Sequence, residues 1–197
     1  MVSQASLSPA QPANTPAALD AEQEATLRAV VIESFGDLFT AYGFTVRLLD
    51  LTHPVASRSH EVVGFIGFAG DVRGSLVVSG PKQLFRRTSP LAGESGELPE
   101  PALFDWTAEL ANQLLGRIKR RFCTLGRDFH ASTPTAVAGR ELSRRFSPRA
   151  GVIDLVFGVG GDLLCLCFEI TPPPDGKIFP SGAEPIPVSN EGDTLLF

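Results

Sequence analysis

The stretch that decides the fold is DWTAELANQLLG, from Asp105 to Gly116, inside a predicted amphipathic helix. Apolar residues recur every three or four positions from about 102 to 122, which is the spacing of one buried helix face. Glu109 and Asn112 fall outside this stripe and are three residues apart, so a carboxylate and a carboxamide share one exposed turn. The predicted stripe consists of Leu103, Trp106, Leu110, Leu114, Ile118 and Phe122.

A second long helix is predicted in the first half of the chain. Asp20 is suited to cap its first turn and Gly43 to end it, with apolar residues at helical spacing in between. Glu33 lies on this helix, but the residue three positions later is Gly36. The acid-amide pair is therefore predicted only on the later helix.

Runs of branched and aromatic residues predict antiparallel strands around the two helices. Gly70 and Asp71 lie between two such runs and are typical of a hairpin turn, and a short helix is predicted at 81–87. The predicted class is α+β, an antiparallel sheet with two long helices, and the order leaves open a pseudo-repeat of a helix plus three strands. The predicted strands span residues 44–51, 61–68, 74–79, 128–132, 135–138, 152–159 and 163–170.

One domain with two tails is predicted. Residues 1–19 are rich in Ser, Pro, Ala and Gln and predict a disordered tail, and residues 172–197 form a Pro/Gly-rich tail whose apolar end either docks or stays unstructured. The folded domain is expected at 20–171. No apolar run reaches the ~18 residues of a membrane span, and the first residues lack a leader pattern, so we expect a cytoplasmic protein without membrane binding.

Positive charge is concentrated in one segment of an acidic chain. Residues 117–149 contain nine Arg and Lys against two acids, a net charge of +7 where the whole chain carries -5. A solvated surface is the default interpretation of such a patch, and an acidic protein surface as partner is the functional alternative. Nucleic acid is disfavoured because aromatic residues do not interleave with the cations.

The cysteines and histidines do not predict a metal site. The three cysteines, Cys123, Cys165 and Cys167, lack the paired spacing of zinc or redox motifs, and the histidines lack ligand spacing. We therefore expect buried thiols and no metal held by this chain.

Three features occur together around the acid-amide pair. They are the spacing Asp105-x3-Glu109-x2-Asn112, Pro134 at 22 positions after Asn112, and the Gly-rich hairpin at 67–75. The acid-amide spacing alone arises often by chance, but the hairpin and the order of elements make the combination more specific. Over residues 20–170 the chain thus resembles the CheC, CheX and FliY phosphatases of bacterial chemotaxis, and CheX-like domains in particular.

The resemblance implies removal of phosphate from the aspartyl phosphate of a CheY-like response-regulator receiver. Asn112 would position the attacking water and Glu109 would pair with the receiver's active-site lysine. Mg²⁺ would belong to the receiver, so no cofactor is expected on this chain. The resemblance also leaves open a homodimer.

Further residues of this helix are candidates for contact with the partner. Gly116 either admits the partner's backbone or packs within the protein, and Asp105 either caps the helix, orients neighbours or favours the helix dipole. Arg117, Lys119 and Arg120 either meet an acidic receiver or form a solvated helix end. The rival function is a non-catalytic adaptor of the same fold that binds a receiver or signalling complex.

Overall fold

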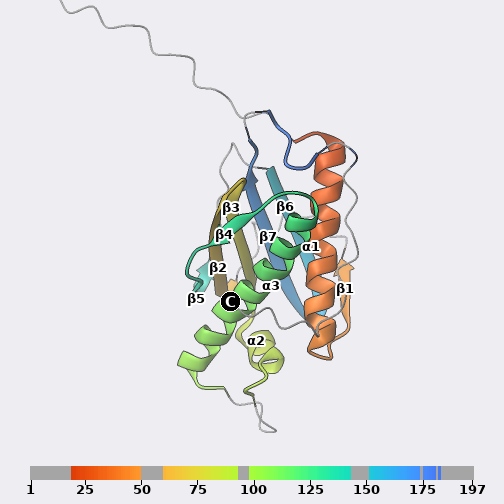
Figure 1. The fold of residues 1–197 in the computed structure, drawn as a ribbon. Helices are drawn as coiled ribbons and strands as arrows, with labels where there is room; N and C mark the ends of the chain where they lie inside the picture. The colour runs from red at the N-terminus through yellow and green to blue at the C-terminus, as the bar shows by residue number, and fades with distance from the viewer. Residues whose placement is uncertain are drawn as a thin grey trace, which may run out of the picture.

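Two long helices cover one face of an antiparallel sheet (Figure 1). This computed structural model describes residues 19–49, 60–92, 98–142, 151–173, 175–180 and 182. The helices are α1 (Ala21–Ala41), α2 (Lys82–Thr88) and α3 (Glu100–Thr124). The strands are β1 (Val46–Leu49), β2 (His60–Gly70), β3 (Arg73–Gly80), β4 (Phe129–Ala131), β5 (Thr135–Leu142), β6 (Gly151–Val159) and β7 (Asp162–Thr171). The predicted α+β class is confirmed.

The strands pair in the order β1-β6-β7-β3-β2-β4, and β5 also pairs with β2. Strands β4 and β5 lie along the same partner, since Ala131 pairs with Phe68 and Thr135 pairs with Phe65. Ser132 bridges the gap between them through hydrogen bonds with Gly67. Together β4 and β5 therefore act as one interrupted edge strand.

The strand order has the symmetry that two related halves would produce. Hairpins β2–β3 and β6–β7 join at the centre through the antiparallel pair β3–β7. The first strand of each half crosses to the other half, because β1 pairs with β6 and β4/β5 pair with β2. Each long helix packs against the strands on its side of the sheet, α1 on β1 and β6, and α3 on β2 and β5. This arrangement matches a pseudo-repeat of a helix plus three strands.

Helix α1 begins and ends where the sequence predicts. The Asp20 carboxylate accepts a hydrogen bond of 2.8 Å from the backbone N–H of Gln23, which is an N-cap. Gly43 follows the helix with a φ of 79°, a conformation that glycine adopts without steric cost. Phe35 stacks on Phe157 of β6 and ties the helix to the sheet.

Helix α3 is held close to the sheet by its apolar stripe. All six residues of the predicted stripe are buried. Thr107 lies directly over Gly64 of β2, where a Cβ would come within 2.7 Å of the Thr107 carbonyl oxygen. Only glycine at this position allows the helix to approach so closely, and the contact fixes α3 just before Glu109.

The described part of the predicted C-terminal tail contains core residues. Ile178 and Phe179 are buried, and the backbone of Phe179 exchanges two hydrogen bonds with the side chain of Gln23. The Arg127 guanidinium donates to the carbonyl of Ile178. Residues 1–18, 174, 181 and 183–197 of the predicted tails lie outside the described residues. None of the helices in the described ranges has an apolar stretch of the length that a bilayer requires.

We expect Gly64→Ala to destabilise the protein, because its methyl group would push Thr107 and α3 off the sheet. The free energy of unfolding should fall by about 1–3 kcal/mol, measured by urea denaturation. Gly36→Ala on α1 is the control, since its Cβ meets nothing within 4 Å. This substitution should raise the free energy of unfolding by at most ~1 kcal/mol. Equal stability of Gly64→Ala and wild type would contradict the close approach.

Candidate functional site

The acid-amide pair lies on an exposed edge of α3. Glu109 and Asn112 are both exposed, on either side of the buried Leu110 and Ala111. The Asn112 amide Nδ2 donates a hydrogen bond of 3.2 Å to Glu109 Oε2. This contact orients the Asn112 amide, because its nitrogen faces the acid and its oxygen Oδ1 is left to accept from another donor.

A second amide holds the other oxygen of Glu109. Gln113 Nε2 donates to Glu109 Oε1 at 2.8 Å. On its far side, Gln113 Oε1 accepts a hydrogen bond of 2.5 Å from the hydroxyl of Tyr42, which caps the end of α1. Both carboxylate oxygens of Glu109 are therefore held by neighbouring amides. Sequence reasoning missed Gln113 and Tyr42 in this role.

The tyrosine itself is supported by a buried tryptophan. The rings of Tyr42 and Trp106 meet edge to face, with centroids 5.3 Å apart. The Trp106 indole Nε1 donates to Thr88 Oγ1 at 3.2 Å, and Thr88 in turn donates to the Leu84 carbonyl. A chain of contacts thus runs from the core of α2 to the exposed carboxylate.

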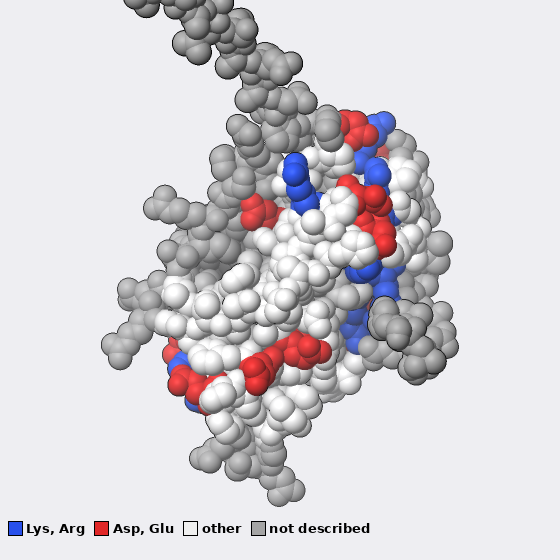
Figure 2. All heavy atoms as spheres, turned by 60° about the vertical axis from the view of Figure 1, so that its left-hand side comes forward, with Lys and Arg blue, Asp and Glu red and all other residues white. Residues whose placement is uncertain are grey.

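The first half of α3 exposes acidic side chains. Figure 2 shows a row of acids across the lower part of the surface, with cations beside its left end and further cations, mixed with acids, towards the upper right. The acids that α3 exposes are Glu100, Asp105 and Glu109. A hydrogen bond from Lys82 lowers the pKa of Glu100. Because α3 begins at Glu100, Asp105 is one turn inside the helix and does not cap it.

Gly116 lies on the same exposed side, one turn beyond Asn112. A Cβ at this position would meet nothing within 4 Å, so no packing contact with the described residues explains the glycine. The helix surface one turn beyond Asn112 therefore has no side chain at Gly116.

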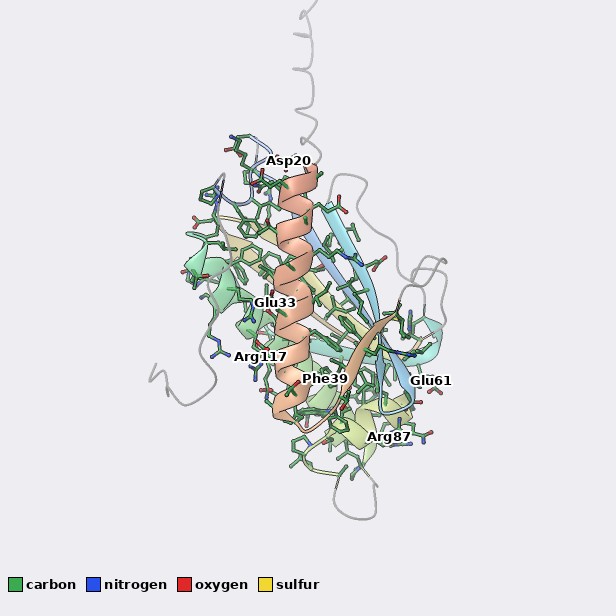
Figure 3. All side chains as sticks on the ribbon, turned by 90° about the vertical axis from the view of Figure 1, so that its right-hand side faces the viewer. Asp20, Glu33, Phe39, Glu61, Arg87 and Arg117 are labelled. Carbon is green, nitrogen blue, oxygen red and sulfur yellow. The ribbon has the colours of Figure 1, made fainter. Side chains whose placement is uncertain are left out.

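The predicted basic residues of α3 divide into two groups, whereas Arg144, Arg145, Arg149 and the side chain of Arg140 lie outside the part of the chain that the structure describes. Arg121 is buried and ion-paired with Asp37 at 2.7 Å and with Glu33 at 3.5 Å, so it joins α3 to α1. Lys119 pairs with Asp128 at 3.2 Å, while Arg117 and Arg120 are half-buried. In Figure 3, Glu33 and Arg117 lie on the same side of the molecule. Part of the predicted basic patch is therefore internal.

The prediction of three buried thiols is wrong for Cys123, although Cys165 and Cys167 are buried. Cys123 follows the buried Phe122 and is rotated off the apolar stripe, because successive helix residues point about 100° apart. Its thiol donates to the Asp128 carboxylate at 3.6 Å. Partial burial, and then the Asp128 charge, raise the pKa of Cys123.

A metal site and an apolar pocket are the other kinds of site that the protein could contain. Within the described ranges, His, Cys, Asp and Glu do not gather in threes that could hold a metal. An apolar pocket of about 200 Å³ lies on the sheet, lined by residues that include Val63, Phe65 and Val77. Val63 and Phe65 flank Gly64, which faces α3, and Val77 of β3 pairs with Phe65, so the pocket opens on the face opposite the helices. It is therefore separate from Glu109.

We expect Asp128→Asn to make Cys123 more reactive. Removing this negative charge lowers the pKa of the thiol towards its ordinary value, so more thiolate is present at pH 8 and alkylation by iodoacetamide is faster. Glu24→Gln on α1, remote in sequence, should leave the rate unchanged. An unaltered rate in Asp128→Asn would show that burial alone controls this thiol.

The chain was compared with known protein families and solved structures. The family model described as "Chemotaxis phosphatase CheX" matches residues 62–155, a span that contains Glu109, Asn112 and Gln113. No curated protein matches the sequence as a relative. The predicted resemblance to the CheC, CheX and FliY family is confirmed by the family model and by the solved structures of similar fold.

Three solved structures illustrate the shared fold. The chemotaxis protein CheX of Vibrio vulnificus is 21% identical, with a TM-score of 0.60, covering 81% of this chain and 99% of that one. CheX in the CheX-CheY-BeF3-Mg+2 complex of Borrelia burgdorferi is 13% identical, with a TM-score of 0.53, covering 75% and 97%. The FliM middle domain of H. pylori is 9% identical, with a TM-score of 0.56, covering 78% and 94%.

Proposed function

Because the CheX family model matches residues 62–155, we propose that this chain hydrolyses the aspartyl phosphate of a CheY-like receiver. The observation that carries the proposal is the Asn112–Glu109 hydrogen bond on an exposed helix edge, one turn before Gly116, where a Cβ would meet none of the described residues within 4 Å. The fold is shared with a CheX solved in complex with CheY.

The chemistry asks little of this protein beyond positioning. An acyl phosphate is already reactive, and its hydrolysis needs a water in line with the leaving oxygen and neutralisation of charge. Asn112 Oδ1 would accept from that water, since Nδ2 is engaged by Glu109. An uncharged amide suits this place because a carboxylate would repel the phosphate. Mg²⁺ on the receiver would supply the charge neutralisation.

Glu109 would serve as the anchor for the receiver's lysine. An ionised carboxylate offers about four acceptor positions, and the amides of Asn112 and Gln113 use two of them. Because Glu109 is exposed, a lysine ammonium could reach the remaining positions and form a charge-assisted hydrogen bond. The acids of α3 would strengthen the local attraction for such a cation.

The rest of α3 would form the contact surface. Gly116 would admit the partner's backbone, and Arg117, Lys119 and Arg120 would meet acidic groups of the receiver. Asp105 would contribute to the acidic half of the helix. The homodimer suggested by the resemblance stays a prediction.

The alternative is an adaptor that binds a receiver without turnover. The same fold occurs in the FliM middle domain, so the fold by itself does not select catalysis. Both functions use the same surface. They differ in the role of Asn112, which the enzyme needs for loss of phosphate and the adaptor does not.

The deciding experiment follows phosphate loss from a receiver of the same organism, phosphorylated with acetyl phosphate in Mg²⁺. Wild type should accelerate the loss, and Asn112→Ala should reduce the acceleration by about 100-fold while leaving binding largely intact. Glu109→Ala should chiefly weaken the complex. The controls are Gln83→Ala and Glu24→Ala, which remove exposed side chains on α2 and α1.

The outcomes separate the two functions. If wild type binds the receiver but leaves its phosphate loss at the intrinsic rate, the adaptor replaces the enzyme. If Asn112→Ala equals wild type in rate, Asn112 does not position the water. If Glu109→Ala retains full affinity, its anchoring role is wrong.

Gly116→Ala tests the contact surface separately from catalysis. Replacing a helix-interior glycine with alanine should raise the free energy of unfolding by up to ~1 kcal/mol, measured by denaturation. The added methyl should also weaken receiver binding, measured by calorimetry, because it occupies the space of the partner's backbone. Gly36→Ala should give the same gain in stability with unchanged affinity. Full affinity in Gly116→Ala would remove this residue from the interface.

A further inference from the structure

We propose that Tyr42 and Gln113 are positioning residues that hold Glu109 ready for the receiver's lysine and thereby orient Asn112. This inference rests on the proposed function for its consequence, although the contacts themselves can be tested without it. Neither residue touches the reacting atoms. They act through Glu109, which is their shared link to the exposed edge.

The direction of each hydrogen bond is determined by the groups involved. Glu109 is a carboxylate and only accepts, so Gln113 must turn its Nε2 towards it, at 2.8 Å. The Gln113 oxygen then faces away and accepts from the Tyr42 hydroxyl at 2.5 Å. A reversed amide would place its oxygen against the carboxylate and lose the bond to Glu109, while its nitrogen would donate to the Tyr42 hydroxyl oxygen. The carboxylate therefore selects the orientation of Gln113, and the Tyr42 hydroxyl holds the Gln113 side chain in place by donating to the oxygen that faces away from Glu109.

The hydroxyl is well placed to do this because its ring is anchored. Tyr42 is the C-cap of α1, and its backbone N–H bonds to the Leu38 and Phe39 carbonyls. Its ring packs on Trp106, which is 4% exposed and hydrogen-bonded to Thr88. The position of the hydroxyl is thus set by helix packing. A long surface side chain such as Glu109 has no comparable restraint of its own.

The consequence for binding is a smaller entropy loss. An unrestrained glutamate must give up rotamer freedom when it pairs with a lysine, and a restrained one has already done so. Since Asn112 donates to the second oxygen of Glu109, the same restraint reaches the amide that would hold the water. Loss of the Tyr42 hydroxyl should weaken receiver affinity by about 5-fold, the middle of the range for ordering one such side chain.

The first test is spectroscopic and needs no partner. Tyr42→Phe removes only the hydroxyl and keeps the ring on Trp106. In NMR spectra of the free protein, the side-chain amide protons of Gln113 should shift and exchange faster with water in Tyr42→Phe than in wild type. Glu109→Gln should disturb the same signals. Unchanged Gln113 signals in Tyr42→Phe would overturn the inference, whatever the activity of the protein.

The second test measures coupling through Glu109. Affinity for the Mg²⁺ and beryllofluoride-loaded receiver should fall about 5-fold in Tyr42→Phe and at least as much in Gln113→Leu. Combining both should add nothing further, and in a Glu109→Ala background Tyr42→Phe should have no effect. Gln83→Leu is the control for loss of an exposed amide. Equal effects of Tyr42→Phe with and without Glu109 would overturn the inferred relay, by which we mean the chain of contacts from Tyr42 through Gln113 to Glu109.

The two proposals fail in different ways. If wild type does not accelerate phosphate loss, the proposed function fails, while the Gln113 signals still decide the relay. If wild type is active and Tyr42→Phe retains full affinity, the relay fails and the proposed function stands. Melting temperatures of all variants, expected within a few degrees of wild type, exclude misfolding as the cause.

Discussion

Burial of the apolar stripe of α3 is the constraint on which the site depends. The stripe fixes the rotation of the helix about its axis, and Gly64 fixes its height above β2 by admitting Thr107. Once both are set, Glu109 and Asn112 have only the solvent side to occupy. The exposure of the pair is thus a result of the hydrophobic packing on the opposite side of the helix.

The two long helices use related positions for different purposes. Their buried residues correspond at a shift of 76, as in Leu27 with Leu103 and Leu38 with Leu114. The same shift sets Glu33 against Glu109, Gly36 against Asn112 and Asp37 against Gln113. In α1 both acids bind the buried Arg121, whereas in α3 the acid is held by uncharged amides and stays available. The acids of α1 therefore stabilise the packing of the two helices, while the equivalent acid of α3 stays exposed to solvent.

The sequence predicted the parts that depend on local periodicity. The helix of Glu109, the cap at Asp20 and the hairpin at Asp71 follow from spacing within a few residues, and each is observed. Contacts between distant segments were not predictable in this way. Tyr42 and Gln113 are 71 residues apart, and their meeting depends on how the helices cross. Likewise Phe179 lies in a Pro/Gly-rich segment whose composition predicts a tail, yet it is buried against Gln23, 156 residues away in sequence.

The exchange of edge strands between the halves has a kinetic consequence. Strand β1 finds its partner β6 only after more than half of the chain has been made, and the central pair β3–β7 also joins distant segments. Loops of this length must close before their pairings give any stabilisation, which slows folding relative to chains with local contacts. During synthesis, the apolar faces of the first helix and of the β2–β3 hairpin would stay exposed to solvent. Such a nascent chain is a natural client for chaperones until its second half emerges.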